Sequence, residues 1–156
     1  MMAQEIASRN SFVLLQIGEQ RFALSADVVA ELAPPVKLHT FPHTSPSVAG
    51  VIVRRGHVVP VYDAGPILIG KSSSAQRFYL IARRRVGKTA EFGAIPVNGE
   101  CELATGDMNP PPDEHPDYVK GTLAVGDASV DVLDLDALIA SHAASRQAQD
   151  LPEERQ

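Results

Sequence analysis

Apolar segments in this sequence are short, and a turn signal follows nearly every one of them. Residues 48–54 and 57–62, for example, are separated only by Arg55-Gly56, a pattern that is typical of a β-hairpin. Twelve prolines and eleven glycines interrupt the chain, and strands do not alternate with long helices as they would in a parallel sheet. Many short strands with frequent turns favour a sandwich or a barrel, so we expect an all-β fold.

The expected strands are rich in β-branched and aromatic residues and lie between turn-forming residues. They cover residues 12–17, 21–24, 48–54, 57–62, 67–69, 77–82, 91–97, 100–103, 119–125 and 128–133. The pair Asn98-Gly99 is the strongest hairpin signal, because a type I′ turn needs positive φ at both central positions. This pair predicts a hairpin between the strands that flank it.

Two short helices are expected between these strands. Apolar side chains recur at helical spacing over Ser25–Leu32, and Pro34-Pro35 ends that segment. Near the end of the sequence, Asp134 or Asp136 can cap a helix that continues to about Ala144.

Charge and composition argue against several kinds of partner. The net charge of −5 disfavours nucleic acid, whose phosphates must be neutralised by Lys and Arg. Trp is absent and only 5% of residues are aromatic, so bases and sugars would find few stacking surfaces. Cys101 is the single cysteine, which fits a reducing compartment. The first ten residues do not resemble a secretory signal, and no apolar stretch approaches the ~20 residues of a membrane span, so we expect a cytoplasmic protein without direct membrane insertion.

Histidines are the first candidates for a metal site. His39 and His43 are four residues apart, and His57 and Asp63 follow in the sequence. Pro42 prevents a helix that would bring the first two histidines onto one face. The spacing therefore favours surface histidines over metal ligands.

Three other segments resemble fragments of known sites. Ser72–Ser74 follows Gly70-Lys71, and Gly87–Thr89 has the letters GKT, but both lack the glycine spacing of a phosphate-binding loop. The acidic residues between 131 and 136 could hold a cation or act in acid–base chemistry. Their alternation fits better a strand edge that leads into a capped helix. The sequence therefore predicts no catalytic residue, no metal site and no cofactor.

The segment from Gly50 to Asp63, GVIVRRGHVVPVYD, resembles the central signature of the CheW family of bacterial chemotaxis coupling proteins. Five further segments resemble family segments in the same order, at residues 12–24, 28–32, 92–95, 118–121 and 131–138. The resemblance extends from about Ser11 to Ile139. The chain departs from the family pattern at Val53, Arg54, Ala64, Gly65 and Val97.

This resemblance implies a fold of two packed SH3-like, five-stranded β-barrel subdomains with two short helices. It implies one CheW-like domain over residues 11–144, between a flexible arm at 1–10 and a flexible tail at 145–156. Members of the family carry no catalytic site. They couple the cytoplasmic helical tips of chemoreceptors to the histidine kinase CheA by binding the CheW-like regulatory domain of the kinase.

The resemblance also implies where a receptor helix would bind. It would lie in an apolar groove between the subdomains, a common mode of helix recognition. The predicted helix Ser25–Leu32, above all Val29, would border this groove. The predicted strand Arg77–Ala82 would border it too, with Phe78 and Leu80.

Arg55 is the further partner-binding residue that the resemblance implies, because it matches the arginine of the central signature. A guanidinium group suits a carboxylate, so its partner would be either Glu31 in the same chain or an acidic group on the kinase or receptor. Arg54 matches nothing in the signature.

Two other functions stay open at the level of sequence. One is an adaptor of a non-flagellar chemosensory pathway, which controls pilus motility or gene expression. The other is a small ligand-binding β-barrel or enzyme, which would need a pocket lined by convergent polar groups.

Overall fold

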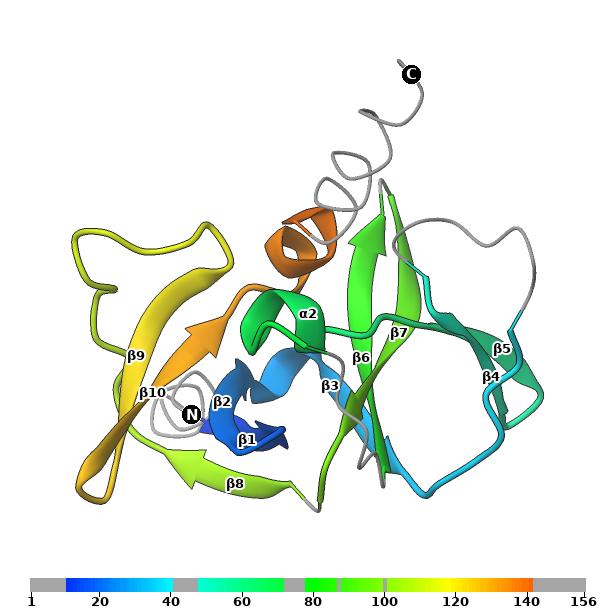
Figure 1. Cartoon of the computed structure of the whole chain (residues 1–156), viewed down its shortest axis with the longest axis horizontal. Helices are drawn as coiled ribbons and strands as arrows, with labels where there is room; N and C mark the ends of the chain where they lie inside the picture. The colour runs from blue at the N-terminus through cyan, green and yellow to red at the C-terminus, as the bar shows by residue number, and fades with distance from the viewer. Residues whose placement is uncertain (1–10, 41–47, 72–77, 87, 100, 142–156) are drawn as a thin grey trace, which may run out of the picture.

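The computed structural model describes residues 11–40, 48–71, 78–86, 88–99 and 101–141. Within them, ten strands form two five-stranded sheets, which confirms the predicted all-β class. The strands are β1 (Ser11–Ile17), β2 (Gln20–Ser25), β3 (Val29–Ala33), β4 (Gly50–Arg54), β5 (His57–Val61), β6 (Phe78–Val86), β7 (Thr89–Val97), β8 (Glu102–Thr105), β9 (Val119–Val125) and β10 (Ala128–Leu133). The first sheet has the order β8-β1-β2-β10-β9, and the second has the order β3-β6-β7-β5-β4 (Figure 1).

The two sheets share one pairing pattern. Each contains two antiparallel hairpins, β1–β2 and β9–β10 in the first sheet and β6–β7 and β4–β5 in the second. A parallel pair joins the hairpins, β2 with β10 and β7 with β5. The remaining strand, β8 or β3, lies at one edge. The second sheet is built from five consecutive strands, whereas the first combines strands from both ends of the domain.

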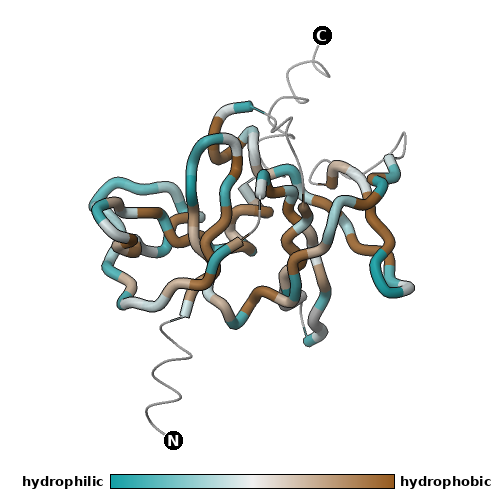
Figure 2. The backbone as a smooth tube through the Cα atoms, turned by 90° about the horizontal axis from the view of Figure 1, so that it is seen from below, coloured by the Kyte–Doolittle hydropathy of each residue, from teal (hydrophilic) through white to brown (hydrophobic). Residues whose placement is uncertain are grey.

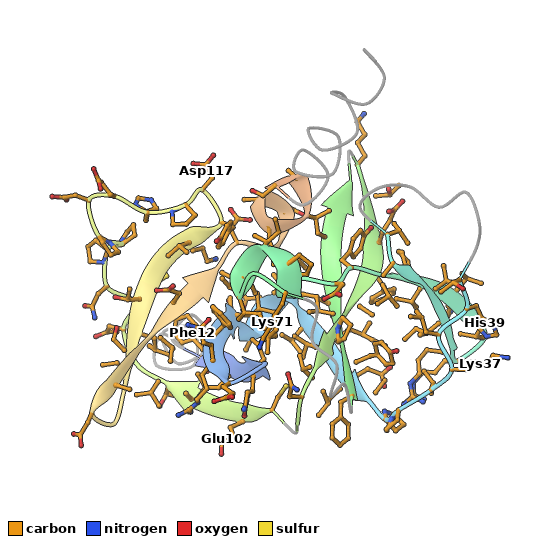
Figure 3. The ribbon with its side chains drawn as sticks, viewed as in Figure 1. Phe12, Lys37, His39, Lys71, Glu102 and Asp117 are labelled. Carbon is orange, nitrogen blue, oxygen red and sulfur yellow. The ribbon has the colours of Figure 1, made fainter. Side chains whose placement is uncertain are left out.

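Among the described residues, the strand ladders do not close either sheet into a complete barrel, which differs from the predicted barrels. After β3, the chain crosses to the opposite edge, where His39 and Val51 of β4 exchange backbone hydrogen bonds of 2.8 and 2.9 Å. After β8, Asn109 and Thr122 of β9 do the same at 2.8 and 3.0 Å. One isolated bridge therefore links the two edges of each sheet, and Figure 3 shows His39 beside β4.

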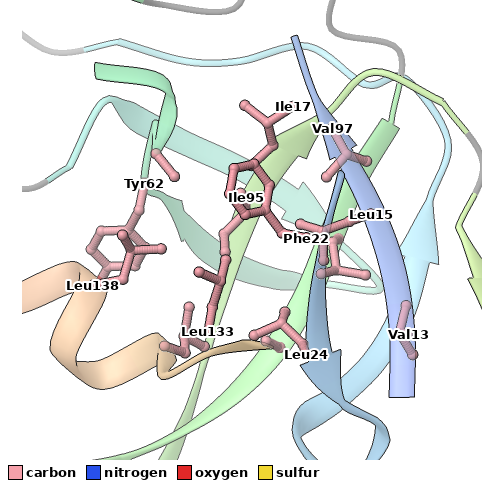
Figure 4. Packing of buried hydrophobic residues seen from close by; sticks show 14 of the residues in the cluster. Val13, Leu15, Ile17, Phe22, Leu24, Tyr62, Ile95, Val97, Leu133 and Leu138 are labelled. Atoms are coloured by element: carbon pink, nitrogen blue, oxygen red, sulfur yellow. The ribbon is translucent and has the colours of Figure 1, made fainter. Parts of the chain in front are cut away.

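Strand β1 lacks a regular alternation of apolar and polar residues because both of its faces are largely buried. In β1, Val13, Leu15 and Ile17 point into a central core between the two sheets, whereas Phe12 and Leu14 point into a core of the first sheet alone. Side chains from β7, β10 and the closing helix meet those of β1 in the central core (Figure 4). Figure 2 shows the same division along the backbone, with apolar residues in the strands and hydrophilic residues at many turns.

The helix predicted over Ser25–Leu32 is wrong. A single 3-10 turn, η1 (Ala26–Val28), is followed directly by β3, which pairs with β6. The β-branched Val29 has an extended backbone, and its pairing with β6 outweighs the helical spacing of the apolar side chains.

The strand predicted at Ile67–Ile69 is also wrong, because that segment lies in and after the short helix α2 (Gly65–Leu68). Asn98-Gly99 does not form the predicted hairpin, since β7 and β8 belong to different sheets. Instead, Asn98 Oδ1 accepts a hydrogen bond of 2.6 Å from the backbone N–H of Gly18. The Asn98 side chain therefore connects the end of β7, in the second sheet, with the β1–β2 turn of the first sheet through this hydrogen bond.

The closing helix is confirmed over residues 135–141. Asp134 caps it by accepting a hydrogen bond of 3.2 Å from the N–H of Ala137, as predicted. Several predictions lie outside the described residues: the arm at 1–10, the tail at 145–156, the end of the helix near residue 144, the Ser72–Ser74 segment and His43.

Candidate functional site

Glu31 of β3 lies between two arginines of the β4–β5 hairpin. Arg54 donates hydrogen bonds from Nε and Nη2 to Glu31 Oε2, at 3.2 and 3.0 Å. Arg55 donates one hydrogen bond from Nε to Glu31 Oε1, at 3.2 Å. One carboxylate therefore faces two guanidinium groups, and this arginine–glutamate cluster carries one excess positive charge.

A β-bulge in β3 directs Glu31 toward the arginines. Val29 pairs with Ala82 of β6, and Glu31 pairs with the next residue back, Ile81, so Ala30 is the extra residue. In a regular strand, Val29 and Glu31 would share one face, because side chains alternate. The bulge places Glu31 on the face of Ile81, while Val29 packs against the central core.

A tight turn brings the arginines to Glu31. Arg55 has a φ of 55° and Gly56 a φ of 79°, as a type I′ turn requires, and the predicted hairpin is confirmed. Within the described part of the chain, Arg55 is the only residue other than glycine with positive φ. A left-handed conformation costs a residue with a Cβ roughly 1–2 kcal/mol, so the turn holds Arg55 in a strained backbone geometry.

The two arginines differ in how much of each is available to solvent. The side chains of Arg54 and Glu31 are 26% and 27% exposed, whereas that of Arg55 is 71% exposed. Among the described residues, no group accepts a hydrogen bond from the terminal amino groups of Arg55. Arg54 is thus the main internal partner of Glu31, and most of the Arg55 guanidinium remains open.

The arginines lower the pKa of Glu31 below its ordinary value. The Arg54 hydrogen bonds are the largest cause, partial desolvation opposes them, and the Arg55 hydrogen bond adds to the lowering. Glu31 is therefore ionised at neutral pH and holds the two arginines by charge-assisted hydrogen bonds.

Replacing Glu31 with Gln is expected to reduce stability more at pH 7 than at pH 3. A carboxyl whose pKa is lowered by folding stabilises the folded state above its unfolded pKa of about 4.3, and this contribution disappears as the pH falls through the folded value. Because the charges are partly exposed, the difference at pH 7 should be at most about 1 kcal/mol. Urea unfolding of wild type and Glu31→Gln at both pH values measures it. A difference that is equal at pH 7 and pH 3 would contradict an ionic origin.

A depression of about 260 Å³ opens beside the arginine–glutamate cluster. Val59 and Ile81 contribute buried apolar surface to its lining, and Phe92 of β7 contributes a ring that is 44% exposed. Arg54 and Arg55 also line it. The depression is thus apolar inside and positively charged at one side.

The five predicted partner-binding residues do not gather at one site. Glu31 and Arg55 come together, but Val29, Phe78 and Leu80 lie toward the central core. Leu80 is 0% exposed, so the prediction that it contacts a partner is wrong, and its side chain is part of the protein interior. Val29 and Phe78 are partly exposed at the border of the central core, and their contact with a partner stays a prediction.

Sequence reasoning missed Arg54 and Phe92 as members of the site. Val53 is 52% exposed although it is apolar, whereas the charged Arg54 is half-buried. The signal for Arg54 was its alternation with the buried Ile52 two residues before it, which places both side chains on one face. No local signal marked Phe92, because its neighbours in space come from other strands.

The described residues contain no group of three or more His, Cys, Asp or Glu side chains that could hold a metal ion. His39 and His57 are both exposed. Burial raises the pKa of the Cys101 thiol to about 11, so it is protonated at neutral pH and a weak nucleophile. None of the described helices has the length and apolar character needed to cross a membrane.

Comparisons with known proteins agree with this architecture. The family model described as the CheW-like domain matches residues 11–143. Among solved structures, the chain is similar to the scaffolding protein TtCheW from Thermoanaerobacter tengcongensis, with a TM-score of 0.69 and 20% sequence identity. That match covers 83% of this chain and 87% of the other. A search of curated proteins finds no match.

Proposed function

Since this chain belongs to the CheW-like domain family, we propose that it is a non-catalytic adaptor that couples chemoreceptors to a CheA-type histidine kinase. The family match over residues 11–143 is the observation that carries the proposal. The adaptor would work in the cytoplasm without a cofactor, and its partners would hold it near the membrane receptors.

An adaptor needs separate surfaces for two partners, and β3 has two distinct faces. Val29 lies at the border of the central core, together with Phe78 of the neighbouring strand β6. We assign this border to the receptor, because partly exposed apolar side chains suit an amphipathic helix. Glu31 and Arg55 lie on the other face of the second sheet, which leaves that face to the kinase.

Assembly with purified partners tests the proposal. The chain should bind both the regulatory domain of its cognate kinase and the helical tip of a cognate receptor, and all three should sediment as one complex. Isothermal titration gives the two affinities separately. Binding to neither partner would overturn the proposed function.

Val29→Asp is expected to weaken receptor binding by about tenfold or more while kinase binding stays at the wild-type level. The substitution puts a carboxylate without a partner into an apolar contact, where desolvating it is costly. Ser129→Asp, at an exposed position of β10, is the matched control for an added negative charge. Because Val29 also packs against the central core, the melting temperature of each variant must be measured as well. Wild-type receptor affinity in a folded Val29→Asp variant would contradict the assignment.

A further inference from the structure

We infer that residues 1–10 fold back onto the first sheet and that the Ile6 side chain fills an apolar depression beside Leu103. The docked segment covers one end of the surface that we assign to the receptor. Only this competition with the receptor rests on the proposed function, because the docking itself involves no partner. Residues 1–10 lie outside the described part of the chain, and the depression, its filled equivalent in the second sheet and the sequence of the segment support their docking.

The Leu103 depression lies at the end of the first sheet where β1 begins. It has a volume of about 380 Å³ and is lined by Ser11 of β1, Ala26 and Asp27 of η1, and residues 103–105 of β8. Leu103 pairs with Val13 and therefore shares its face, which is the face of the central core. Val13 is buried, but Leu103 is 78% exposed, more than any other large hydrophobic residue that the structure describes. The first sheet thus leaves apolar surface uncovered at this end.

The second sheet contains an equivalent of this position. The sequence Glu-Leu-Ala occurs at residues 102–104 in β8 and again at residues 31–33 in β3. Both strands lie at the same place in their sheets, at one edge and beside the first strand of a hairpin. Leu32 pairs with Leu80 of β6, as Leu103 pairs with Val13 of β1. Leu32 is therefore the structural equivalent of Leu103.

In the second sheet, a phenylalanine occupies the place that is open in the first. Phe78 lies two residues before Leu80, and Ser11 lies two residues before Val13, so the two residues are equivalent and point to the same face. Phe78 is the diagonal neighbour of Leu32, and both pack against the central core. Ser11 has no ring to offer, and its side leaves Leu103 exposed. The Leu103 depression therefore fits one large apolar side chain from another segment.

The segment before Ser11 has the position and the composition to supply that side chain. Ser11 itself lines the Leu103 depression, so the segment leaves the sheet at the rim. Ile6 is the single large apolar residue between positions 3 and 10. The four residues between Ile6 and Ser11 span up to about 14 Å when extended, which allows the chain to reverse direction and return. Asp27 in the lining has no ion pair among the described residues, and Arg9 can provide its counter-charge.

Ala26 connects the Leu103 depression with the surface that we assign to the receptor. It packs at the border of the central core together with Val29 and Phe78, and Val29 directly follows η1. A receptor helix on this border meets the docked segment, so the segment must leave before the helix can bind fully. The apparent receptor affinity is therefore reduced by the fraction of molecules in which the segment is docked.

Disulfide trapping tests the docking without any partner. Ala7→Cys and Thr105→Cys place thiols beside Ile6 and in the lining of the Leu103 depression, in a Cys101→Ser background that removes the native thiol. With glutathione disulfide as the oxidant, the intrachain disulfide should form at least tenfold faster than in a control with Ala7→Cys and Val58→Cys. Val58 is 67% exposed but lies in the second sheet.

Two substitutions should lower the trapping rate of the Thr105 pair to that of the control. Ile6→Asn removes the apolar side chain from the segment and leaves both sheets intact. Ser11→Phe fills the Leu103 depression from β1, as Phe78 does from β6 in the second sheet. The melting temperature of each variant shows whether it is folded.

Receptor binding tests the competition. Ile6→Asn should bind the receptor tip about threefold to tenfold more tightly than wild type, because its segment no longer covers the surface. Its affinity for the kinase regulatory domain should equal that of wild type. Ser8→Asn, in the same segment, is the matched control and should bind both partners as wild type does.

The outcomes separate this inference from the proposed function. Equal trapping rates for the Thr105 and Val58 pairs would show that the segment does not dock and would overturn the inference. If trapping depends on Ile6 but Ile6→Asn binds the receptor as wild type does, the competition with the receptor is wrong. If wild type binds neither partner, the proposed function fails, whereas the trapping rates still decide whether the segment docks.

Discussion

Replacing Leu80 with Ala is expected to lower the free energy of unfolding by about 2–5 kcal/mol. The Leu80 side chain is 0% exposed and lies in the central core, between Leu32 of β3 and Ile95 of β7. Truncation removes its transfer free energy and leaves a cavity between two sheets that cannot fully collapse. A domain of this size has a total stability of about 5–15 kcal/mol, so the loss is a large fraction of it.

Thermal and urea unfolding measure the effect of Leu80→Ala, with roughly 2–4 °C of melting temperature for each kcal/mol. Val58→Ala is the matched control, because Val58 also lies in a strand of the second sheet but is 67% exposed. We expect the control to stay within about 0.5 kcal/mol of wild type. If the Leu80→Ala variant is as stable as wild type but no longer binds the receptor, Leu80 is a partner-contact residue after all.

Replacing Gly50 or Gly121 with Ala is expected to lower the free energy of unfolding by about 1–3 kcal/mol or more. A Cβ on Gly50 would lie 2.6 Å from the backbone oxygen of His39, and one on Gly121 would lie 2.7 Å from that of Asn109. These oxygens belong to the isolated bridges that link the edges of the two sheets. The backbone must shift to make room for the methyl group, and the shift disrupts the bridge.

Gly99→Ala is the control for these two substitutions. Apart from its chain neighbours, none of the residues that the structure describes comes within 4 Å of a Cβ built on Gly99, and the φ of Gly99 is outside the positive range. The main expected effect there is therefore the lower chain entropy of the unfolded state. We expect this variant to be as stable as wild type or slightly more so. Equal melting temperatures for all three alanine variants would show that the crossing segments tolerate a Cβ and that the bridges contribute little.

Gly50 and Gly121 also show what the resemblance to the family did not explain. Both belong to segments that resemble family motifs, but the resemblance gives no reason for a glycine at either position. The reason is the same in both sheets: a crossing segment passes over the strand at a distance that excludes a side chain. The sequence by itself could not pair Gly50 with His39, because the contact depends on how the segment between β3 and β4 crosses the sheet.

Local interactions determined much of the fold directly from the sequence. The β4–β5 turn at Arg55-Gly56 follows from a residue that tolerates positive φ, and the Asp134 cap follows from a carboxylate before a helical segment. Both involve atoms only a few residues apart, so the tertiary structure adds little to them. The all-β class follows in the same way from the short apolar segments.

Contacts between strands that are distant in the sequence decided the features of the fold that local interactions did not. Asn98-Gly99 has the composition of a hairpin, but the chain passes there from one sheet to the other, and Asn98 binds Gly18 instead. The bulge at Ala30 reverses which face Glu31 occupies, and it exists because β3 must match the register of β6. No pattern within β3 encodes that register. The sequence alone therefore determined most of the strand segments and many of their turns, but not β3 or the segment at Ile67–Ile69. The tertiary structure decided which side chains meet, because pairing partners and faces depend on residues far apart in the chain.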